Sequence, residues 1–387
     1  MIINHLRLIS FRAHEESSPA FGPKVNLIYG PNGAGKTNIL EAIHYLALSK
    51  SFLSATDGYA LRKGAAFFEL EGSFAGTHRA GLNVRLAYMP EEGKRMFINK
   101  SPLERLAKIV GQIPIVVFAP SDQALTAEGP DVRRRFLNNI LSQARPVYLD
   151  DLMKYRRALK QRNVLLTQYR RTRSLAREVL SSWDAELIRL GSRVILSRLR
   201  FVHVFSDFLE EAYERIDSVS EHPHMRYRAI DQFDPEADEQ AIQEAFMAKL
   251  HQSSKRELEL GRTMVGPHRD ELIFTLNDLE VRRYASQGQH RTFGMALKLA
   301  QYFYLKAQID ESPILLLDDL FGNLDETRTQ VFLELLDSDV IGQSIITAAQ
   351  RAPFDKTLSF GTDDNRALYV DAGQVSAAPI LPNDFAA

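Results

Sequence analysis

The sequence predicts an α/β fold in which both ends of the chain form one lobe and a mainly helical second lobe is inserted between them. Three observations support this prediction. A strand-like run, a glycine-rich loop and a helical pattern occupy residues 25–46, a helix-forming stretch runs from Pro130 to Ala212, and an apolar run ends in two aspartates at 314–319. Hydrophobic residues make up 45% of the 387 residues and charged residues 25%, which is typical of a globular chain with a large core.

The composition excludes several classes of function. The chain has no cysteine, which excludes disulfides, thiol catalysis and cysteine-based zinc sites. No apolar run approaches the roughly 18 residues needed to span a membrane, and Met1–Leu8 lacks the basic start and apolar block of a secretory signal. We therefore expect a cytoplasmic protein without a membrane partner. The net charge of −1 carries no global nucleic-acid signature, so DNA binding has to depend on local patches.

The N-terminal region is expected to be rich in strands, because its apolar runs are separated by glycine, proline and acidic turns. The expected strands are Ile2–Phe11, Val25–Tyr29, Phe67–Phe74, Gly81–Met89, Arg95–Ile98 and Ile113–Phe118. In the inserted part we expect one strand at Met225–Ile230 and a further helix at Ala241–Leu250. The predicted domains are therefore 1–120 together with 309–387 as lobe I, and 121–308 as a mainly helical, basic lobe II.

The glycine-rich loop follows the pattern G-x-x-x-x-G-K-[ST] of P-loop nucleotide-binding proteins. Its glycines let backbone N–H groups converge on phosphate oxygens, while Lys36 supplies a positive charge and Thr37 a hydroxyl for Mg²⁺. A strand before the loop and helical spacing over Asn38–Leu46 after it give the arrangement that this chemistry needs. The loop therefore predicts ATP or GTP with Mg²⁺ as ligand. The binding candidates here are Gly30, Pro31, Asn32, Gly33, Ala34, Gly35, Lys36, Thr37 and Asn38.

The apolar run Ile314–Asp319 supplies the acidic groups that a P-loop site needs. Asp318 is expected to help hold Mg²⁺ together with Thr37, and Asp319 to polarise the attacking water as general base. Taken alone, the run also fits an ordinary strand followed by a capped turn. Its combination with the glycine loop favours the nucleotide site, and makes Lys36, Asp318 and Asp319 the catalytic candidates.

Residues 284–291 resemble the signature loop of ABC-type ATPases. Ser286 and Gln289 form a capping box before a helix that we expect from His290 to about Ile309, and such a helix start attracts anions. A well-capped helix without a ligand is the alternative when the loop is judged in isolation. In ABC-type ATPases this loop closes on the γ-phosphate held by a second protomer. On that likeness the further nucleotide-binding candidates are Ser286, Gln287, Gly288 and Gln289.

Residues Phe321–Asp325 look like the D-loop, which in ABC-type ATPases follows the acidic strand and crosses the same dimer interface. This likeness adds Asp325 to the nucleotide-binding candidates. The order of loop, long insertion, signature loop and acidic strand predicts an ABC-type P-loop ATPase head built from the N- and C-terminal segments.

The chain resembles the RecF family of bacterial recombination proteins, relatives of the SMC ATPases without the long coiled coil. The resemblance covers nearly the whole chain, and its motifs are residues 35–43 (GKTNILEAI), 133–137 (RRRFL), 161–166 (QRNVLL), 265–270 (VGPHRD) and 285–289 (ASQGQ). It implies an ATP-dependent homodimer that binds double-stranded and gapped DNA and helps to load RecA, together with RecR and RecO. It also implies weak, DNA-stimulated ATP hydrolysis.

Two positions depart from the usual ABC pattern. Asp319 stands where most members carry glutamate, and its shorter reach toward water suggests slow hydrolysis. Ala348 stands where the switch histidine is expected. Both departures fit a timer or clamp better than a fast motor. The glutamine that couples the lobes stays open between Gln112 and Gln123.

Basic residues gather in the inserted lobe. Residues 154–177 include nine Lys or Arg and no Asp or Glu, and Arg133–Arg135 adds three more. Such a block favours sequence-independent attraction to DNA phosphates, while a solvated helical face is the alternative. No recognition-helix motif indicates base-specific readout. His268 is expected to be a structural hydrogen-bonding residue rather than a metal ligand.

Three other functions are alternatives to a DNA-stimulated ATPase. An SMC-like scaffold would bind ATP for assembly without productive turnover. A nucleotide-binding subunit of a transporter fits less well, because 249 positions separate Thr37 from Ser286. A small-molecule kinase leaves the signature loop unexplained.

Overall fold

The structure is a computed structural model that describes residues 1–77, 79–174, 177–216, 221–234, 236–323 and 325–377. The chain divides into two compact units. Unit 1 comprises Met1–Asp122, Glu214–Ser218 and Met295–Ala387, and unit 2 comprises Gln123–Tyr213 and Val219–Gly294. The last ten residues of the predicted 309–387 segment lie outside the described residues. Among the residues described, no helix is both long and apolar enough to cross a bilayer.

Unit 1 contains an antiparallel sheet with the strand order β2-β1-β4-β5-β6-β7. Its two longest pairings join β1 with β4 and β4 with β5. Buried and more exposed side chains alternate along β1 and β4, so one face of the sheet packs on the core. The strands are β1 (Ile2–Phe11), β2 (His14–Ser17), β4 (Phe68–Gly76), β5 (Arg79–Met89), β6 (Gly93–Ile98) and β7 (Ser101–Pro102). All six strands predicted for the N-terminal region are therefore confirmed, four in this sheet and two in the next, with ends shifted by at most two residues. The short β2 and β7 were not expected.

A second, mainly parallel sheet of unit 1 has the order β15-β14-β3-β13-β12-β8. Strand β13 pairs with β3 on one side and β12 on the other, so the carboxyl ends of these three strands meet at one edge. The strands are β3 (Val25–Tyr29), β8 (Ile115–Phe118), β12 (Ile314–Asp318), β13 (Ser344–Ala348), β14 (Arg366–Asp371) and β15 (Gln374–Ala377). The edge formed by β3, β13 and β12 carries the glycine loop and the acidic residues.

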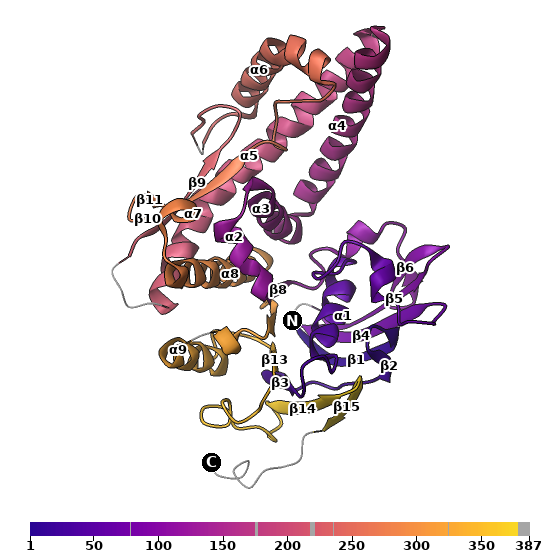
Figure 1. Cartoon of the computed structure of the whole chain (residues 1–387), viewed down its shortest axis with the longest axis vertical. Coiled ribbons are helices and arrows are strands. Elements are labelled where there is room, and N and C mark those ends of the chain that lie inside the picture. The colour runs from indigo at the N-terminus through magenta and orange to yellow at the C-terminus, as the bar shows by residue number, and fades with distance from the viewer. Residues whose placement is uncertain (78, 175–176, 217–220, 235, 324, 378–387) are drawn as a thin grey trace. The chain divides into compact units, whose positions relative to one another are not determined.

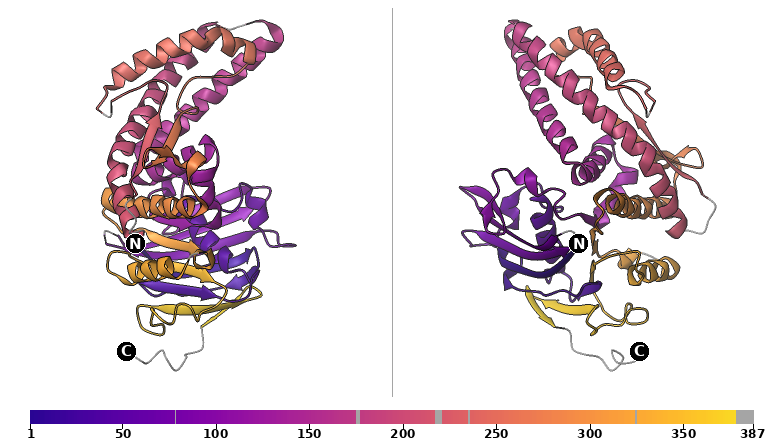
Figure 2. Two further views of the ribbon diagram at one scale, coloured as in Figure 1. Left: turned by 60° about the vertical axis from the view of Figure 1, so that its left-hand side comes forward. Right: turned by 180° about the vertical axis from the view of Figure 1, so that it is seen from behind.

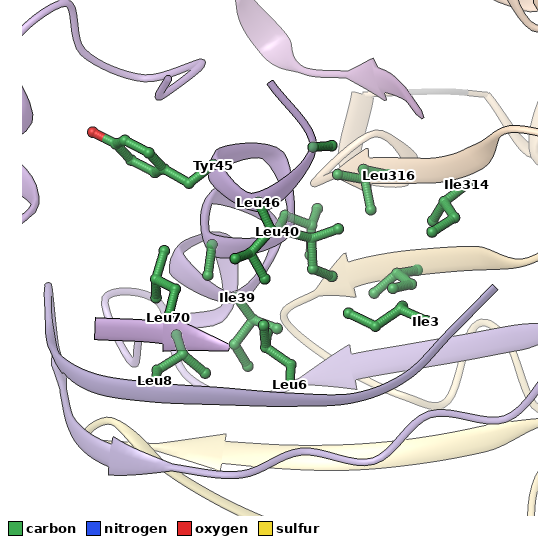
Figure 3. Packing of buried hydrophobic residues seen from close by; sticks show 14 of the residues in the cluster. Ile3, Leu6, Leu8, Ile39, Leu40, Tyr45, Leu46, Leu70, Ile314 and Leu316 are labelled. Carbon is green, nitrogen blue, oxygen red and sulfur yellow. The ribbon is translucent and has the colours of Figure 1, made fainter. Parts of the chain in front are cut away.

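Helix α1 (Lys36–Leu48) packs between the two sheets of unit 1 and carries the core of this unit. Figure 3 shows Ile39 and Leu40 of α1 close to Leu6 and Leu70 of the antiparallel sheet, with Leu316 of the parallel sheet nearby. All five side chains are completely buried. Burial of such a side chain stabilises the fold by about 1.5–3 kcal/mol, so α1 holds the loop that precedes it on a rigid base.

The C-terminal part of α8 (Gln287–Ile309) belongs to unit 1 from Met295 onward, although the sequence placed the whole of 121–308 in the second lobe. The reason lies in its contacts within unit 1. The hydroxyl of Tyr302 accepts a hydrogen bond from the Gly342 amide at 2.7 Å, and Lys306 Nζ donates to the Val340 carbonyl at 2.8 Å. The remaining elements of unit 1 are α9 (Glu326–Asp337) and 3-10 turns at Asp57–Ala60, Leu106–Ile109 and Phe321–Asn323. A further 3-10 turn, Pro120–Gln123, lies at the boundary between the units.

Unit 2 is mainly helical, as expected. Its elements are α2 (Ala124–Ala127), α3 (Pro130–Ala144), α4 (Pro146–Thr172), α5 (Arg177–Ile216), α6 (Glu239–Leu260), α7 (Val281–Tyr284), and the strands β9 (Pro223–Arg228), β10 (Glu271–Leu276) and β11 (Leu279–Glu280). The end of α5 from Glu214 and of α8 from Met295 belong to unit 1. Figure 2 shows α4, α5 and α6 as long helices lying along one another. Arg162 of α4 joins them, because it pairs with Asp184 of α5 at 2.5 Å and Glu257 of α6 at 2.7 Å.

The motif at 265–270 has a structural role in unit 2. Arg198 of α5 is almost fully buried, and its guanidinium donates to the Pro267 carbonyl at 2.6 Å and to Asn138 Oδ1 at 3.0 Å, with Asp270 Oδ2 at 3.4 Å. His268 contacts Tyr155 Oη through Nδ1 at 2.6 Å, and burial lowers the pKa of His268 to about 4. The expected structural hydrogen bonding of His268 is therefore confirmed.

Candidate nucleotide-binding site

The loop between β3 and α1 has a backbone that only glycine accommodates at its first position. Gly30 has φ 148°, and a Cβ there would lie 2.0 Å from the Val370 carbonyl oxygen of the neighbouring β14. Pro31, Asn32 and Gly33 form an exposed crest, whereas Ala34 and Gly35 are buried. The loop therefore has a fixed base and an accessible top, from which α1 starts at Lys36.

Lys36 lies against the loop that precedes it. Its ammonium donates to the Gly30 carbonyl at 2.8 Å and to the Pro31 carbonyl at 2.9 Å. Burial lowers the pKa of Lys36, while the charges of Asp319 and Asp318 act in the opposite direction. The charge is thus held beside the loop and within the field of both aspartates.

Thr37 and Asp318 come together across the gap between α1 and β12. The Thr37 hydroxyl donates to Asp318 Oδ1 at 2.7 Å, although 281 positions separate the two residues. Burial raises the pKa of Asp318, and the hydrogen bonds from Thr37 and Thr347 lower it. Because the Thr37 proton is directed to the carboxylate, the oxygen lone pairs of Thr37 are left for a cation.

This donor set fits Mg²⁺, which prefers oxygen ligands and takes one or two protein groups together with substrate phosphates. Thr37 supplies a hydroxyl oxygen and Asp318 a buried carboxylate. Within the described ranges, no group of three or more His, Cys, Asp or Glu side chains could hold a metal by itself. Thr37 and Asp318 supply two oxygens, so the other ligands of a cation here would come from nucleotide phosphates and water.

Asp319 leaves the strand directly after Asp318. The strand ends one residue earlier than the predicted run 314–319, because Asp319 has φ 47°, a left-handed conformation that aspartate tolerates better than most residues. Its amide donates to Thr347 Oγ1 at 3.0 Å, and its side chain is exposed. The exposed carboxylate is placed beside the buried one, as a general base would need.

A second set of contacts holds the glycine loop in place, and no sequence motif predicted it. The ring of His14 on β2 contacts the Gly35 carbonyl through Nε2 at 3.0 Å and the Gly373 carbonyl through Nδ1 at 2.8 Å. The Gly373 amide donates to the Ala34 carbonyl at 2.9 Å. Burial lowers the pKa of His14. These partners lie up to 359 positions apart, so no local pattern predicts them.

The signature residues belong to unit 2, whereas the glycine loop and the two aspartates belong to unit 1. The predicted capping box is confirmed: Gln289 N donates to Ser286 Oγ at 3.2 Å, and Ser286 N donates to Gln289 Oε1 at 2.8 Å. Ser286, Gln287 and Gly288 are exposed. Helix α8 starts at Gln287, three residues before the expected position, and so includes the signature glycine in its first turn.

Gly288 is not required by the packing of its own chain. Among described atoms, the nearest one that a Cβ at this position would meet is Ser286 Oγ at 3.8 Å. Glycine within a helix costs roughly 0.5–1 kcal/mol relative to alanine. Packing within the chain therefore does not require glycine at this exposed helix start. The missing side chain would allow another molecule to approach the helix start closely.

Asp325 has a local role that the sequence did not predict. Its Oδ1 accepts a hydrogen bond from the Arg328 amide at 2.9 Å, which caps α9, and this bond lowers the pKa of Asp325. The side chain is exposed. Leu324 of the predicted D-loop lies outside the described residues.

The basic cluster of unit 2 is smaller than the sequence suggested. Arg162 and Arg133 are almost fully buried, and Arg133 pairs with Glu271 at 2.7 Å, so both stabilise the fold instead of facing solvent. Arg134 pairs with Asp131. The exposed cations of α4 are Lys154, Arg156, Arg157, Lys160, Arg170 and Arg171, with Arg173 directly after the helix. Three of them, Arg156, Lys160 and Arg171, line a groove of about 720 Å³. Figure 1 shows the course of α4, the helix that carries them.

The two sheets of unit 1, the glycine loop and the acidic strand end define an ABC-type P-loop ATPase head. The comparisons agree. Residues 2–360 match the N-terminal domain shared by RecF, RecN and SMC proteins. The chain belongs to the RecF family of DNA replication and repair proteins.

Individual relatives support this assignment. The DNA replication and repair protein RecF of Salinibacter ruber is 54% identical, covering 100% of this chain and 94% of the relative. A solved structure described as the recombination mediator protein RecF with ATP in the RecFOR pathway is 27% identical, covers 97% of each chain and has a TM-score of 0.89. The Smc head domain from Pyrococcus furiosus, 14% identical with a TM-score of 0.56, covers 98% of this chain and 96% of its own and shows the same fold.

Proposed function

We propose that this protein is an ATP-dependent clamp on double-stranded DNA that acts at gaps, with slow, DNA-stimulated ATP hydrolysis. The observation that carries the proposal is the division of the candidate site. The loop, Thr37 and Asp318 come together in unit 1. The start of the signature helix is exposed, and packing within the chain does not require its glycine, Gly288. Two copies that each cover the other's nucleotide account for both facts, so ATP would close the dimer and hydrolysis would open it.

The residues of unit 1 divide the work of hydrolysis. The amides of the loop and Lys36 hold the phosphates, and Thr37 with Asp318 holds Mg²⁺. When bound, Mg²⁺ neutralises charge on the β- and γ-phosphate oxygens. Asp319 orients the attacking water and accepts its proton. The short side chain of Asp319 and its tie to Thr347 restrict its reach, which supports slow turnover.

Replacing Asp319 with asparagine is expected to lower the single-turnover hydrolysis rate by about 100-fold, because the amide cannot accept a proton. Binding of ATP is expected to change by less than about twofold, since Asp319 stands outside the loop. Asp319→Glu keeps a carboxylate and serves as the matched variant, with turnover retained. Rates are measured with and without gapped DNA. Equal rates for Asp319→Asn and the original protein would contradict the assignment of the base, and no turnover in the original protein would favour the ATP-binding scaffold.

The α4 cations are the proposed contact for the DNA backbone. Their guanidinium and ammonium groups face solvent along one helix, and no described acidic residue lies between Lys154 and Thr172 on it. Such an array attracts phosphates without reading bases. This fits a clamp that recognises a DNA structure and not a sequence.

Exchanging Arg156, Lys160 and Arg171 for glutamine is expected to weaken duplex binding by about 10- to 100-fold at low salt. The slope of log K against log salt should fall by up to about 3, because each lost phosphate contact removes about 0.9. Anisotropy of a labelled duplex between about 50 and 200 mM salt gives both values. The control removes three cations that pair with acids in unit 2: Arg189, Arg193 and Lys249. Equal losses in both variants would contradict a role for α4.

The proposed partners are RecR with RecO, and through them RecA. The support is the family and the RecFOR pathway named for the similar ATP-bound protein. We propose a cytoplasmic location on the same ground. The alternative of a transporter subunit loses its support, because the match extends over residues 2–360 to the RecF, RecN and SMC family.

A further inference from the structure

Thr347 lies at the centre of the candidate catalytic edge, yet no sequence motif assigned it a role. It stands on β13, the strand between β3 and β12, and it is paired in register with Asp318 on one side and Ile28 on the other. The residue is almost fully buried. A buried hydroxyl at this place has to find partners among the groups that end the neighbouring strands.

Its hydroxyl serves both aspartates at once. Thr347 Oγ1 lies 2.9 Å from Asp318 Oδ1 and accepts a hydrogen bond from the Asp319 amide at 3.0 Å. The Leu317 carbonyl is a more distant acceptor at 3.4 Å, so the single proton is better used on the charged Asp318 oxygen. One side chain therefore uses its donor for the buried carboxylate and its acceptor for the backbone of the exposed one.

The first bond constrains the position of the Asp318 carboxylate, and the second constrains the backbone of Asp319. Asp318 Oδ1 also accepts from Thr37 at 2.7 Å, so the bond from Thr347 fixes this oxygen from the strand side while Thr37 approaches from α1. Asp319 has φ 47°, and the bond to its amide fixes the direction in which its side chain leaves the strand. Loss of the hydroxyl would loosen both carboxylates without touching the loop.

We propose that Thr347 is a positioning residue that orients the metal-binding Asp318 and the general base Asp319 together. The inference rests on the proposed ATP hydrolysis and deepens it. Ala348, at the position where ABC-type ATPases carry the switch histidine, has no polar side chain to contribute. The link between β13 and the catalytic carboxylates is thus made one residue earlier, by a hydroxyl fixed in the sheet.

The test compares Thr347→Val, which keeps the shape and removes the hydroxyl, with Thr347→Ser, which keeps the hydroxyl. Titration calorimetry of ATP with and without Mg²⁺ measures how much the cation strengthens binding, and single-turnover hydrolysis measures the chemical step. For Thr347→Val we expect unchanged binding of Mg²⁺-free ATP, a roughly 10-fold smaller effect of Mg²⁺ and a roughly 10- to 100-fold slower reaction. Thr347→Ser should stay within about threefold of the original protein in both measurements.

Thr357→Val is the matched control, because it removes a hydroxyl of unit 1 that bonds to Gln330 at 3.1 Å, and it should leave both measurements unchanged. The inference is overturned if Thr347→Val retains the original Mg²⁺ effect and hydrolysis rate. It is also overturned if Thr347→Ser is as defective as Thr347→Val. If the original protein binds Mg²⁺-ATP without turnover, hydrolysis fails as a function, but the Mg²⁺ effect still decides the role of Thr347. If it binds no Mg²⁺-ATP, both proposals fail.

Discussion

Replacing Lys36 with alanine is expected to lower the affinity for ATP by at least about 100-fold and to abolish hydrolysis. Charge-assisted hydrogen bonds of an ammonium to phosphate are worth about 1.5–3 kcal/mol each, and Lys36 is the charged side chain that the loop itself contributes. The substitution also removes the two bonds from Nζ to the Gly30 and Pro31 carbonyls, so the loop loses an internal support. Equilibrium binding of a fluorescent ATP analogue measures the loss.

The matched control is Lys24→Ala. Lys24 precedes β3 at the end of the strand opposite the loop, and its pair with Asp339 at 3.4 Å is largely exposed, so its removal changes little. Unchanged ATP affinity in Lys36→Ala would mean that the nucleotide is held elsewhere.

Changing Ser286 to arginine is expected to abolish ATP-dependent dimerisation while ATP binding to each copy stays within about twofold. The exposed start of α8 would receive a long cation in place of the small cap, so the neighbouring copy could not approach closely. The nucleotide bound by the substituted copy itself is unaffected in the proposed arrangement, because the loop and aspartates that hold it belong to unit 1. Sedimentation with ATP measures the dimer, and calorimetry measures the binding.

Two variants separate this effect from general damage. Ser286→Ala removes the cap at a cost of about 1 kcal/mol and leaves room for a partner, so dimers should persist. Ser254→Arg makes the same exchange on an exposed residue of α6. If Ser286→Arg forms dimers like the original protein, the signature loop does not take part in the interface.

The fold was largely predictable because its main elements are encoded locally. The apolar runs 25–29 and 314–318, the glycine loop between the first of them and α1, and the capping box at Ser286 each carry their own signal, and the structure confirms them. The boundary near 309 was less predictable. Tyr302 and Lys306 bind to unit 1 through residues far along the chain, so α8 is divided between the units within a single helix.

In the candidate site, sequence motifs predicted residues that come together in the structure, but they did not predict the contacts that support those residues. Thr37 and Asp318 follow from patterns, whereas His14, Gly373 and Thr347 enter through contacts that only the sheet order creates. Charge counting also failed in part, because it cannot separate a solvated arginine from one buried in an ion pair. Arg133 and Arg162 belong to the second kind.

The central claim is that ATP is enclosed between two copies of the chain. Its most direct test is the molar mass by analytical ultracentrifugation over a range of protein concentrations, with ATP, ADP or no nucleotide, each with and without duplex DNA. The account predicts a concentration-dependent doubling of mass with ATP, reduced with ADP and lost in Ser286→Arg. A protein that binds and turns over ATP as a single copy at every concentration would contradict it.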